Sequence, residues 1–284
     1  GCDNCPGNYN PGQQDIDNDG FGDDCDDVDP YWSSGAPILF SRYSHTSTLL
    51  LDGSILVVAG SSLGSAERYN PQARSSKIVA SPNTGRWGHT ATLLPSGNVL
   101  ITGGQWNEYP RDETEIYNSK EDTWTETTPL NYPRIYHTAT SLKDGRILVV
   151  GGRISEDTTT NTAEIFTTNP AGWTQVNSMS IPRRDHTASL LNDGRVLVAG
   201  GYSPPGTVED SVEIFDPETG QWSTVAPMNA PRWLHTATVL SDGRILVAGG
   251  ISNQTTGFLA SAEIYNPTEN TWTLLSDSMG TSRA

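Results

Sequence analysis

The chain has 284 residues, of which 18% are charged, and its formal net charge is −16. An acidic balance of this size argues against nucleic acid or an anionic membrane surface as the main partner. The sequence also lacks an apolar run of roughly 18 residues, so none of its segments is expected to span a bilayer.

The first 30 residues are acidic and cannot form a hydrophobic core. Nine aspartates lie there without a Lys or Arg, and the chain starts at Gly1-Cys2, which suggests a processed product or a fragment. The spacing of the acidic residues matches a calcium-binding loop, in which oxygen ligands occupy positions 1, 3, 5, 7, 9 and 12. The predicted ligands are Asp15, Asp17, Asp19, the Phe21 carbonyl, Asp23 and Asp26. The flanks offer no helices for an EF-hand, and the alternative is a solvated acidic linker without metal.

This segment resembles the thrombospondin type 3 repeat. The resemblance rests on DNCP at Asp3–Pro6, NP at Asn10-Pro11 and DIDNDGFGDDCD at Asp15–Asp26. It implies a repeat that wraps around Ca²⁺ and carries a disulfide between Cys5 and Cys25. Cys2 would then be the last cysteine of a preceding repeat. Disulfides and calcium ligands together predict an extracellular or cell-surface protein.

From Tyr31 onward one stretch recurs, most clearly as PRWLHTATVLSDGRILVAGG at Pro231–Gly250. Two apolar, β-branched runs flank Asp242-Gly243, which predicts a β-hairpin with a tight turn. The stretch occurs five times, with a period of 44 to 49 residues between its histidines. These histidines are His45, His89, His137, His186 and His235. A period in this range indicates a solenoid, a propeller or another repeat array.

Each repeat continues with two further strands. An AEIY-like strand follows a loop, and a fourth strand begins near Trp124, Trp173, Trp222 or Trp272. Four short strands per repeat without a helical pattern predict twisted four-stranded sheets, which must stack on their neighbours to cover their apolar faces. Radial stacking of such sheets gives an all-β propeller.

These repeats resemble kelch repeats. The marks are the Gly-Gly after the second strand, the aromatic residue ending the third strand and the tryptophan six or seven residues later. The resemblance implies two domains, a calcium-binding repeat at 1–30 and a kelch-type β-propeller at 31–284. Repeat one departs from the pattern at Gly60-Ser61 and Ser76, so its sheet is expected to be the least well packed.

Charged residues also recur with the period of the fold. An arginine precedes every first strand and a glutamate lies in every third strand, which predicts a ring of inter-strand ion pairs rather than a charged ligand cage. The histidines either each fix a backbone carbonyl or, as the alternative, encircle the channel and bind a transition metal.

A binding function is favoured over catalysis. Secreted kelch propellers that resemble copper carbohydrate oxidases need a Tyr–Cys crosslink, and this chain has no cysteine after Cys25. A carbohydrate-active enzyme of the kelch type is therefore the weaker alternative, and the sequence predicts no enzyme.

The loops between strands two and three and between strands four and one should share one face of a propeller. These loops contain the predicted ligand-binding aromatics Trp87, Trp106, Tyr109, Tyr136, Tyr202 and Trp233, with Arg111, Arg153 and Glu156 as polar anchors. Such a face suits a glycan or a protein ligand, unless several of the rings pack between blades. The predicted function is thus calcium-stabilised extracellular recognition, adhesion or structural support.

The repeat pattern is unfinished at both ends. Residues 32–38 align with a fourth strand that has no inner strands before it, and Met279 to Arg283 align with the approach to a further first strand. Five complete repeats and a split sixth are therefore expected. Either a longer chain supplies the absent strands or another chain does, and the second case predicts head-to-tail self-association into a filament.

Overall fold

We analysed a computed structural model of the chain, which describes residues 35–60, 64–252, 257–276 and 279–282. The predicted calcium ligands and the Cys5–Cys25 disulfide lie outside these residues. The described part contains no helix, and therefore none that is long and apolar enough to cross a membrane.

The described strands form five antiparallel four-stranded sheets, here called blades one to five, as the repeat pattern predicts. Blade one contains β1 (Thr46–Leu49), β2 (Ile55–Val58), β3 (Ala66–Asn70) and β4 (Ser75–Val79). Blade two contains β5 (Thr90–Leu93), β6 (Val99–Thr102), β9 (Thr114–Asn118) and β10 (Thr123–Thr127). Blade three contains β11 (Thr138–Ser141), β12 (Ile147–Val150), β13 (Ala163–Thr168) and β14 (Ala171–Val176).

Blade four contains β15 (Thr187–Leu190), β16 (Val196–Ala199), β19 (Val212–Asp216) and β20 (Gln221–Val225). Blade five contains β21 (Thr236–Val239), β22 (Ile245–Ala248), β23 (Ala262–Asn266) and β24 (Thr271–Leu274). Two small hairpins extend the loops that join second to third strands. They are β7 (Gln105–Trp106) with β8 (Tyr109–Pro110), and β17 (Tyr202–Ser203) with β18 (Thr207–Val208).

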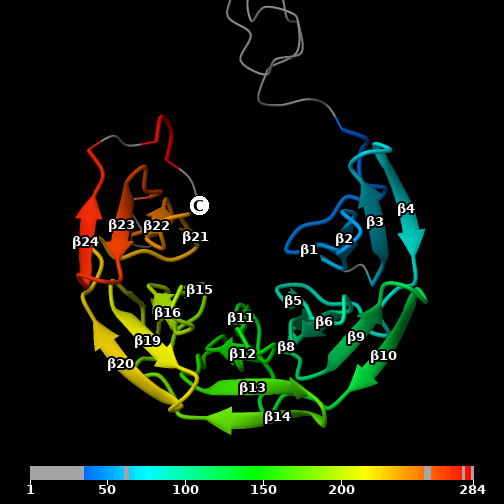
Figure 1. Cartoon of the computed structure of the whole chain (residues 1–284), viewed down its shortest axis with the longest axis horizontal. Coiled ribbons are helices and arrows are strands. Elements are labelled where there is room, and N and C mark those ends of the chain that lie inside the picture. Colours follow the sequence, from blue (N-terminus) through cyan, green and yellow to red (C-terminus); the bar gives the residue numbers. More distant parts are fainter. Residues whose placement is uncertain (1–34, 61–63, 253–256, 277–278, 283–284) are drawn as a thin grey trace, which may run out of the picture.

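The blades stand side by side around a central axis as an open arc (Figure 1). The first strand of each blade lies innermost and the fourth strand outermost, and blades one and five face each other across the opening. Residues 35–38 are not part of a strand and contact blade one, where the Ser76 hydroxyl donates to the Pro37 carbonyl at 3.1 Å. This part of the 32–38 segment therefore does not close the ring against blade five.

The turn of the first hairpin follows directly from its residues. In blade five, the Gly243 N–H donates to the Leu240 carbonyl at 2.9 Å, and Gly243 has a φ of 86°. Glycine adopts this left-handed conformation without steric cost. The Asp242 carboxylate accepts the Arg244 N–H at 3.0 Å and its Nε–H at 2.7 Å, which fixes the turn to the start of β22.

Apolar side chains pack between neighbouring blades, because successive residues of a strand point to opposite faces of its sheet. In β12, Ile147 packs with Leu100 of blade two, whereas Leu148 packs with Val196 of blade four. A blade inside the arc therefore depends on both of its neighbours to remove its apolar faces from water.

The tryptophan near the start of a fourth strand joins two blades. The Trp173 ring packs on Phe166 with ring centroids 5.0 Å apart, and its indole N–H donates to the Thr128 carbonyl of blade two at 3.1 Å. Blades two, four and five repeat this arrangement. In blade one, Ser76 takes the place of the tryptophan and leaves Tyr69 half-buried. Blade one thus lacks the large ring that covers the third strand elsewhere.

Five buried ion pairs confirm the predicted pairing of the repeated arginines and glutamates. The N···O distances are 2.5 to 3.0 Å, and the side chains are at most 3% exposed. The pairs are Arg42–Glu67, Arg86–Glu115, Arg134–Glu164, Arg183–Glu213 and Arg232–Glu263. In blade three, Arg134 also donates to the Gly151 carbonyl at 2.7 Å, and Glu164 accepts the Asn131 N–H at 2.8 Å. Each pair therefore ties the incoming chain to the third strand of its own blade.

Replacing Glu164 by alanine should lower the free energy of unfolding by about 3–5 kcal/mol, because the Arg134 charge would remain buried without a partner. Urea denaturation measures the effect. Asp193→Ala is the matched control, since it breaks the exposed Asp193–Arg195 pair and should cost about 0–1 kcal/mol. Similar losses in the two variants would contradict a structural role for the buried pairs.

Candidate functional site

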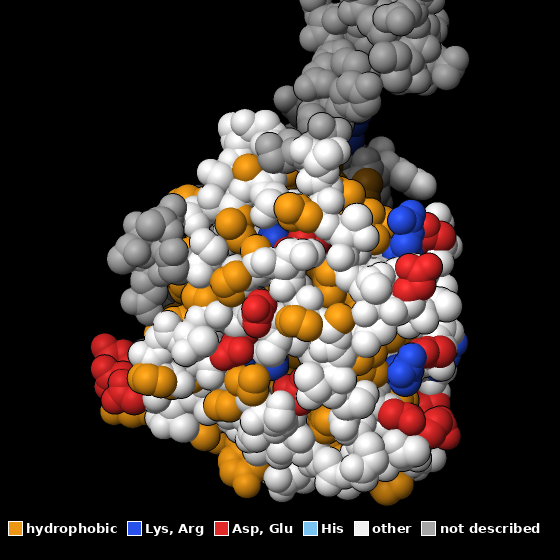
Figure 2. Space-filling model, turned by 90° about the vertical axis from the view of Figure 1, so that its left-hand side faces the viewer, with side chains coloured by type: hydrophobic (Ala, Val, Ile, Leu, Met, Phe, Trp, Pro, Cys, Tyr) orange, Lys and Arg blue, Asp and Glu red, His pale blue; other side chains and the backbone are white. Residues whose placement is uncertain are grey.

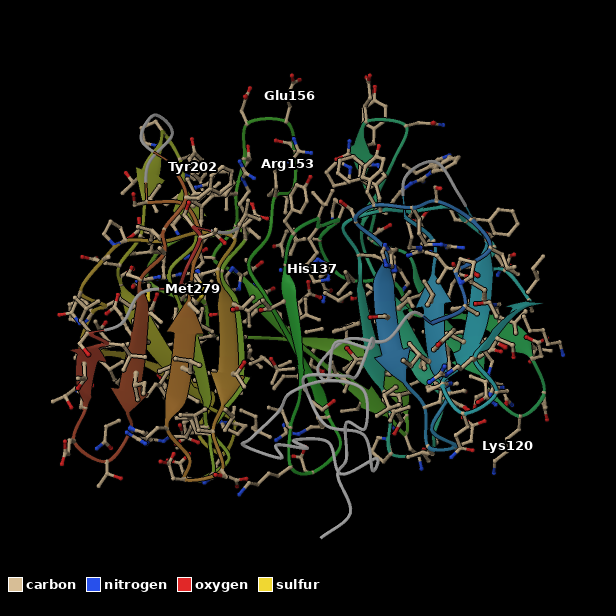
Figure 3. All side chains as sticks on the ribbon, turned by 90° about the horizontal axis from the view of Figure 1, so that it is seen from above. Lys120, His137, Arg153, Glu156, Tyr202 and Met279 are labelled. Carbon is tan, nitrogen blue, oxygen red and sulfur yellow. The ribbon has the colours of Figure 1, made fainter. Side chains whose placement is uncertain are left out.

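The two faces of the arc differ in what they carry. The loops between second and third strands form one face, called here the upper face, which carries Arg153, Glu156 and Tyr202 at the top of Figure 3. Lys120, in the turn between β9 and β10, lies at the opposite face. Acidic and basic side chains lie next to each other along one rim in Figure 2. The hairpin turns contain exposed Asp–Arg pairs of this kind.

A pocket of about 660 Å³ opens on the upper face over blades two, three and four. We call it the upper pocket. The lining residues that matter for its chemistry are Trp87, Tyr136, Arg153, Glu156, Arg184 and Tyr202. Trp87, Tyr136, Arg153, Glu156 and Tyr202 were predicted from the sequence as ligand-face residues or anchors.

The repeat itself positions the floor of the upper pocket. In blades two to five, the residue directly after the buried arginine pairs with the residue after the Gly-Gly of the same blade, as in Trp87 with Gln105 and Arg184 with Tyr202. The next residue has a left-handed backbone, with φ of 59° at Tyr136 and 52° at Asp185. Because the flanking arginines are fixed in the core, these variable side chains are presented at fixed places.

Aromatic rings and one guanidinium form a continuous row across the upper face. The Arg184 guanidinium lies 5.9 Å from the Tyr136 ring, 4.7 Å from Tyr202 and 5.6 Å from Trp233. The Tyr202 and Trp233 rings are 5.5 Å apart, and the Trp87 and Tyr136 rings meet edge to face at 5.9 Å. We call these five side chains the aromatic row. The ring pairs join loops of neighbouring blades, and all of the rings are half-buried.

Other predicted ligand residues lie elsewhere. Trp106 and Tyr109 belong to the β7–β8 hairpin and do not line the upper pocket, and Tyr109 is 74% exposed. Arg111 is paired with Glu113 at 2.9 Å and is likewise outside the pocket. The length and direction of a loop decide such placements, and neither follows from its composition.

The two arginines of the upper pocket differ in their partners. Arg184 forms an ion pair with the adjacent Asp185 at 2.7 Å. Arg153 donates to the neutral side chain of Gln105 at 2.5 Å and has no carboxylate within 4.0 Å among the described residues. Its Nε–H is buried without a hydrogen-bond partner. Arg153 is therefore the cation of this pocket that an anionic group can reach.

Asp185 was not predicted as a site residue. Burial raises the pKa of its carboxyl to about 6, and the nearby Arg184 and Arg153 only partly oppose this. The charge of the pocket floor consequently changes in mildly acidic conditions. Arg184 and Asp185 lie between the repeated Arg183 and the repeated His186. The residues at these two positions differ from repeat to repeat, and this variation was the sequence signal that could have identified them.

The histidines connect neighbouring blades through side chains. The Nε2 atom of His137 lies 3.0 Å from the Thr90 hydroxyl of blade two, and His89, His186 and His235 make the same contact at 2.9 Å. Nε2 thus contacts a side chain, because the threonine that follows each histidine lies against the next blade. The predicted backbone partner is present too, since His137, His186 and His235 each form a backbone hydrogen bond with the buried arginine of the same blade. Within the described ranges, no three His, Cys, Asp or Glu side chains are arranged to hold a metal ion.

Comparisons with known proteins agree with this architecture. A profile described as the KLHDC2/KLHL20/DRC7 Kelch-repeats domain matches residues 88–283. A solved structure titled "Structure of YjhT" superposes with a TM-score of 0.71 at 16% identity, over 88% of this chain and 87% of that one. At this identity the likeness concerns the fold alone. No curated protein sequence matches the chain.

The buried histidines should make the protein sensitive to acid. Burial, aided by the nearby arginine, lowers the pKa of His89 and His235 to about 3, and it lowers those of His137 and His186 well below 6.5. Below pH 6.5 the unfolded chain therefore binds protons that the folded chain does not. Stability should fall by about 1.4 kcal/mol per buried histidine for each pH unit below that value.

Urea denaturation across the range from about pH 7 to pH 5 measures this slope. His89→Gln should remove the contribution of His89 to this slope. His45→Gln should change the slope least, because His45 is exposed. A stability that does not decline with acidification would show that the histidines are not held neutral.

Proposed function

The chain belongs to the kelch-repeat family, and on this premise we propose that it is a protein-binding module whose upper pocket receives an extended segment of a partner protein. Kelch domains typically bind protein partners. The observation that carries the proposal is the combination of the aromatic row with the Arg153 guanidinium, whose side-chain partner is the neutral Gln105. A volume of about 660 Å³ lies in the range of ligand sites.

The chemistry of the pocket defines the segment that would fit. The carboxylate of an acidic side chain or of a C-terminus can reach Arg153, and a flat apolar side chain can pack on the rings of the aromatic row. Glu156 and Asp157 are exposed at the rim, where they favour a basic residue next to the acidic one and disfavour a uniformly acidic partner. A segment with mixed charges is thus the best match.

A glycan is the second candidate ligand. The exposed ring of Tyr109 favours it, since sugars pack on exposed aromatic faces and this ring is not engaged in the aromatic row. Arg153 favours a peptide, because its guanidinium has a neutral side chain as its partner and can bind the carboxylate of an acidic residue. We propose recognition rather than catalysis for either ligand.

We further propose that this recognition takes place outside the reducing cytosol, on a calcium-stabilised surface or adhesion protein. The support is the spacing of the predicted ligands at Asp15–Asp26 and the predicted Cys5–Cys25 disulfide. The arc would then be displayed next to a short calcium-bound stalk.

Arg153→Met should weaken binding of an acidic peptide by about 10- to 100-fold, since a charge-assisted hydrogen bond contributes about 1.5–3 kcal/mol. The probe is a peptide selected from a random display library on the intact chain, and the affinity is measured by calorimetry. Arg111→Met is the matched control, because Arg111 lies in a loop of the same kind but is paired with Glu113. Equal losses in both variants, or selected peptides without acidic residues, would contradict the proposed site, and binding on a glycan array alone would favour the second candidate.

Calcium should protect the N-terminal segment from proteolysis. We expect cleavage between Asp15 and Asp29 to be slow in calcium and rapid after chelation, because the crowded carboxylates repel each other without a cation. Asp19→Ala should reproduce the effect of chelation at this segment, while the propeller stays intact as the internal control. Equal cleavage with and without chelator would rule out the calcium site.

A further inference from the structure

A second pocket lies between blades one and two, on the face opposite to the upper pocket. It has a volume of about 420 Å³. Its walls are the β1–β2 turn and the outer strands β3 and β4 of blade one, together with the β9–β10 turn of blade two. Lys120, in the β9–β10 turn, marks its position in Figure 3. We call it the lower pocket.

The lower pocket is cationic although the chain as a whole has a net charge of −16. Its lining contains the cations of Arg68, Lys77 and Lys120. It contains only two carboxylates, those of Asp52 and Asp122. In the upper pocket and in two further pockets of the described residues, cations do not outnumber carboxylates. The excess of positive charge is therefore a local feature of the junction between blades one and two.

Two of these cations replace residues that are uncharged in every other blade. Arg68 lies directly opposite Lys77 in the register of β3 and β4. In blades two to five the equivalent pair is an isoleucine opposite a threonine or serine. These pairs are Ile116–Thr125, Ile165–Thr174, Ile214–Ser223 and Ile264–Thr273. Like charges directly opposite each other are destabilising, so the sheet by itself does not favour an Arg–Lys pair.

Arg68 is held in place by groups from both blades. Its guanidinium forms an ion pair with Asp52 and donates to the Ser54 hydroxyl at 2.9 Å. It also donates to the Ser119 carbonyl of blade two at 3.2 Å. The side chain is only 23% exposed. Arg68 therefore joins the two turns that form the walls of the lower pocket, and these walls need no rearrangement to receive a ligand.

The two lysines, in contrast, have no partner within the described ranges. Neither Lys77 nor Lys120 forms an ion pair within 4.0 Å or a hydrogen bond there, and both are exposed. The Asp122 carboxylate does not neutralise them at contact distance. Its Oδ1 atom instead accepts the Ala80 N–H at 2.8 Å and the Tyr117 hydroxyl at 2.9 Å. Two ammonium groups thus line the lower pocket without a counter-ion.

We propose that the lower pocket binds the phosphate group of a phosphorylated sugar between Lys77 and Lys120. A phosphate monoester carries a charge of about −1.5 to −2 at pH 7, which matches two ammonium groups. Lysine binds phosphate as a point charge and needs no fixed fork geometry. A carboxylate is a poorer match, because it brings a single charge and the Arg68 fork that could hold it already binds Asp52 and Ser54.

The rest of the lining favours a sugar as the carrier of the phosphate. Apart from Val79, every residue of the lower pocket has a polar side chain. Hydroxyl and amide groups are provided by Asn70 and Ser75 of blade one and by Ser119 of blade two. Such groups form hydrogen bonds with sugar hydroxyls and offer little apolar surface to a peptide side chain. The net charge of −16 disfavours a long polyanion, so a short phosphorylated sugar is the best match.

Calorimetric titration of the intact chain in calcium-free buffer tests this site. The probes are glucose 6-phosphate, glucose and inorganic phosphate. We expect glucose 6-phosphate to bind more tightly than inorganic phosphate, and glucose to show no binding. Glucose 6-phosphate should also raise the melting temperature, because a ligand of the folded state stabilises it by mass action.

Lys77→Thr is the decisive variant, because threonine is the residue of three other blades at this position. It should weaken glucose 6-phosphate binding by about 10-fold or more. Without ligand its melting temperature should be unchanged or higher, since the like-charge pair with Arg68 is removed. Lys143→Thr is the matched control. It removes one positive charge near the hairpin turn of blade three, where four carboxylates line a separate pocket, and should leave the affinity unchanged.

The proposal stands apart from the proposed function, because the two pockets lie on opposite faces. Equal losses in Lys77→Thr and Lys143→Thr would overturn it, since general charge rather than a site would then attract the ligand. Absence of binding would overturn it as well. Equal affinities for inorganic phosphate and glucose 6-phosphate would rule out the sugar, and tighter binding of a phosphoserine peptide would do the same. Loss of binding in Arg153→Met but not in Lys77→Thr would assign the ligand to the upper pocket instead.

Discussion

Each blade contains a buried ion pair between the arginine before its first strand and the glutamate of its third strand. This pair fixes the position of the loop residues on the upper face of the blade. Its guanidinium also binds backbone carbonyls near the glycine pair, and its carboxylate holds an N–H of the incoming chain. A buried charge tolerates little displacement, because loss of its partner leaves it both unpaired and dehydrated. The loop residues that follow the arginine are therefore placed by the core and not by the loop.

The sequence was sufficient to predict most of the fold, because the same physical signals occur in every repeat. Alternating apolar strands, the Asp-Gly turn of the first hairpin and the arginine–glutamate period all describe contacts within one blade. The contact of each histidine was not predictable in this way. Its partner, such as Thr90 for His137, lies a whole repeat away, and no local spacing indicates which side chains of two blades meet.

The candidate site was predictable only in part, because composition identifies the residues of a loop but not the direction in which the loop runs. Composition identified aromatic loop residues such as Trp87, Tyr136 and Tyr202, which do line the upper pocket. It did not show that Trp106 and Tyr109 lie on a separate hairpin, because direction depends on how a loop folds over its neighbour. Arg184 was overlooked because it directly follows the repeated Arg183, although three aromatic rings lie around its guanidinium.

The left-handed residue before each motif histidine has a consequence for how such a protein diversifies. The residue at this position differs in every blade, being Ser44, Gly88, Tyr136, Asp185 or Leu234, while one backbone hydrogen bond joins it to its equivalent at each of the four junctions between consecutive blades. Mutations at this position can therefore alter recognition while the framework is conserved. The side chains that face a ligand and the backbone atoms that join the blades are therefore separate, so a change in one need not disturb the other.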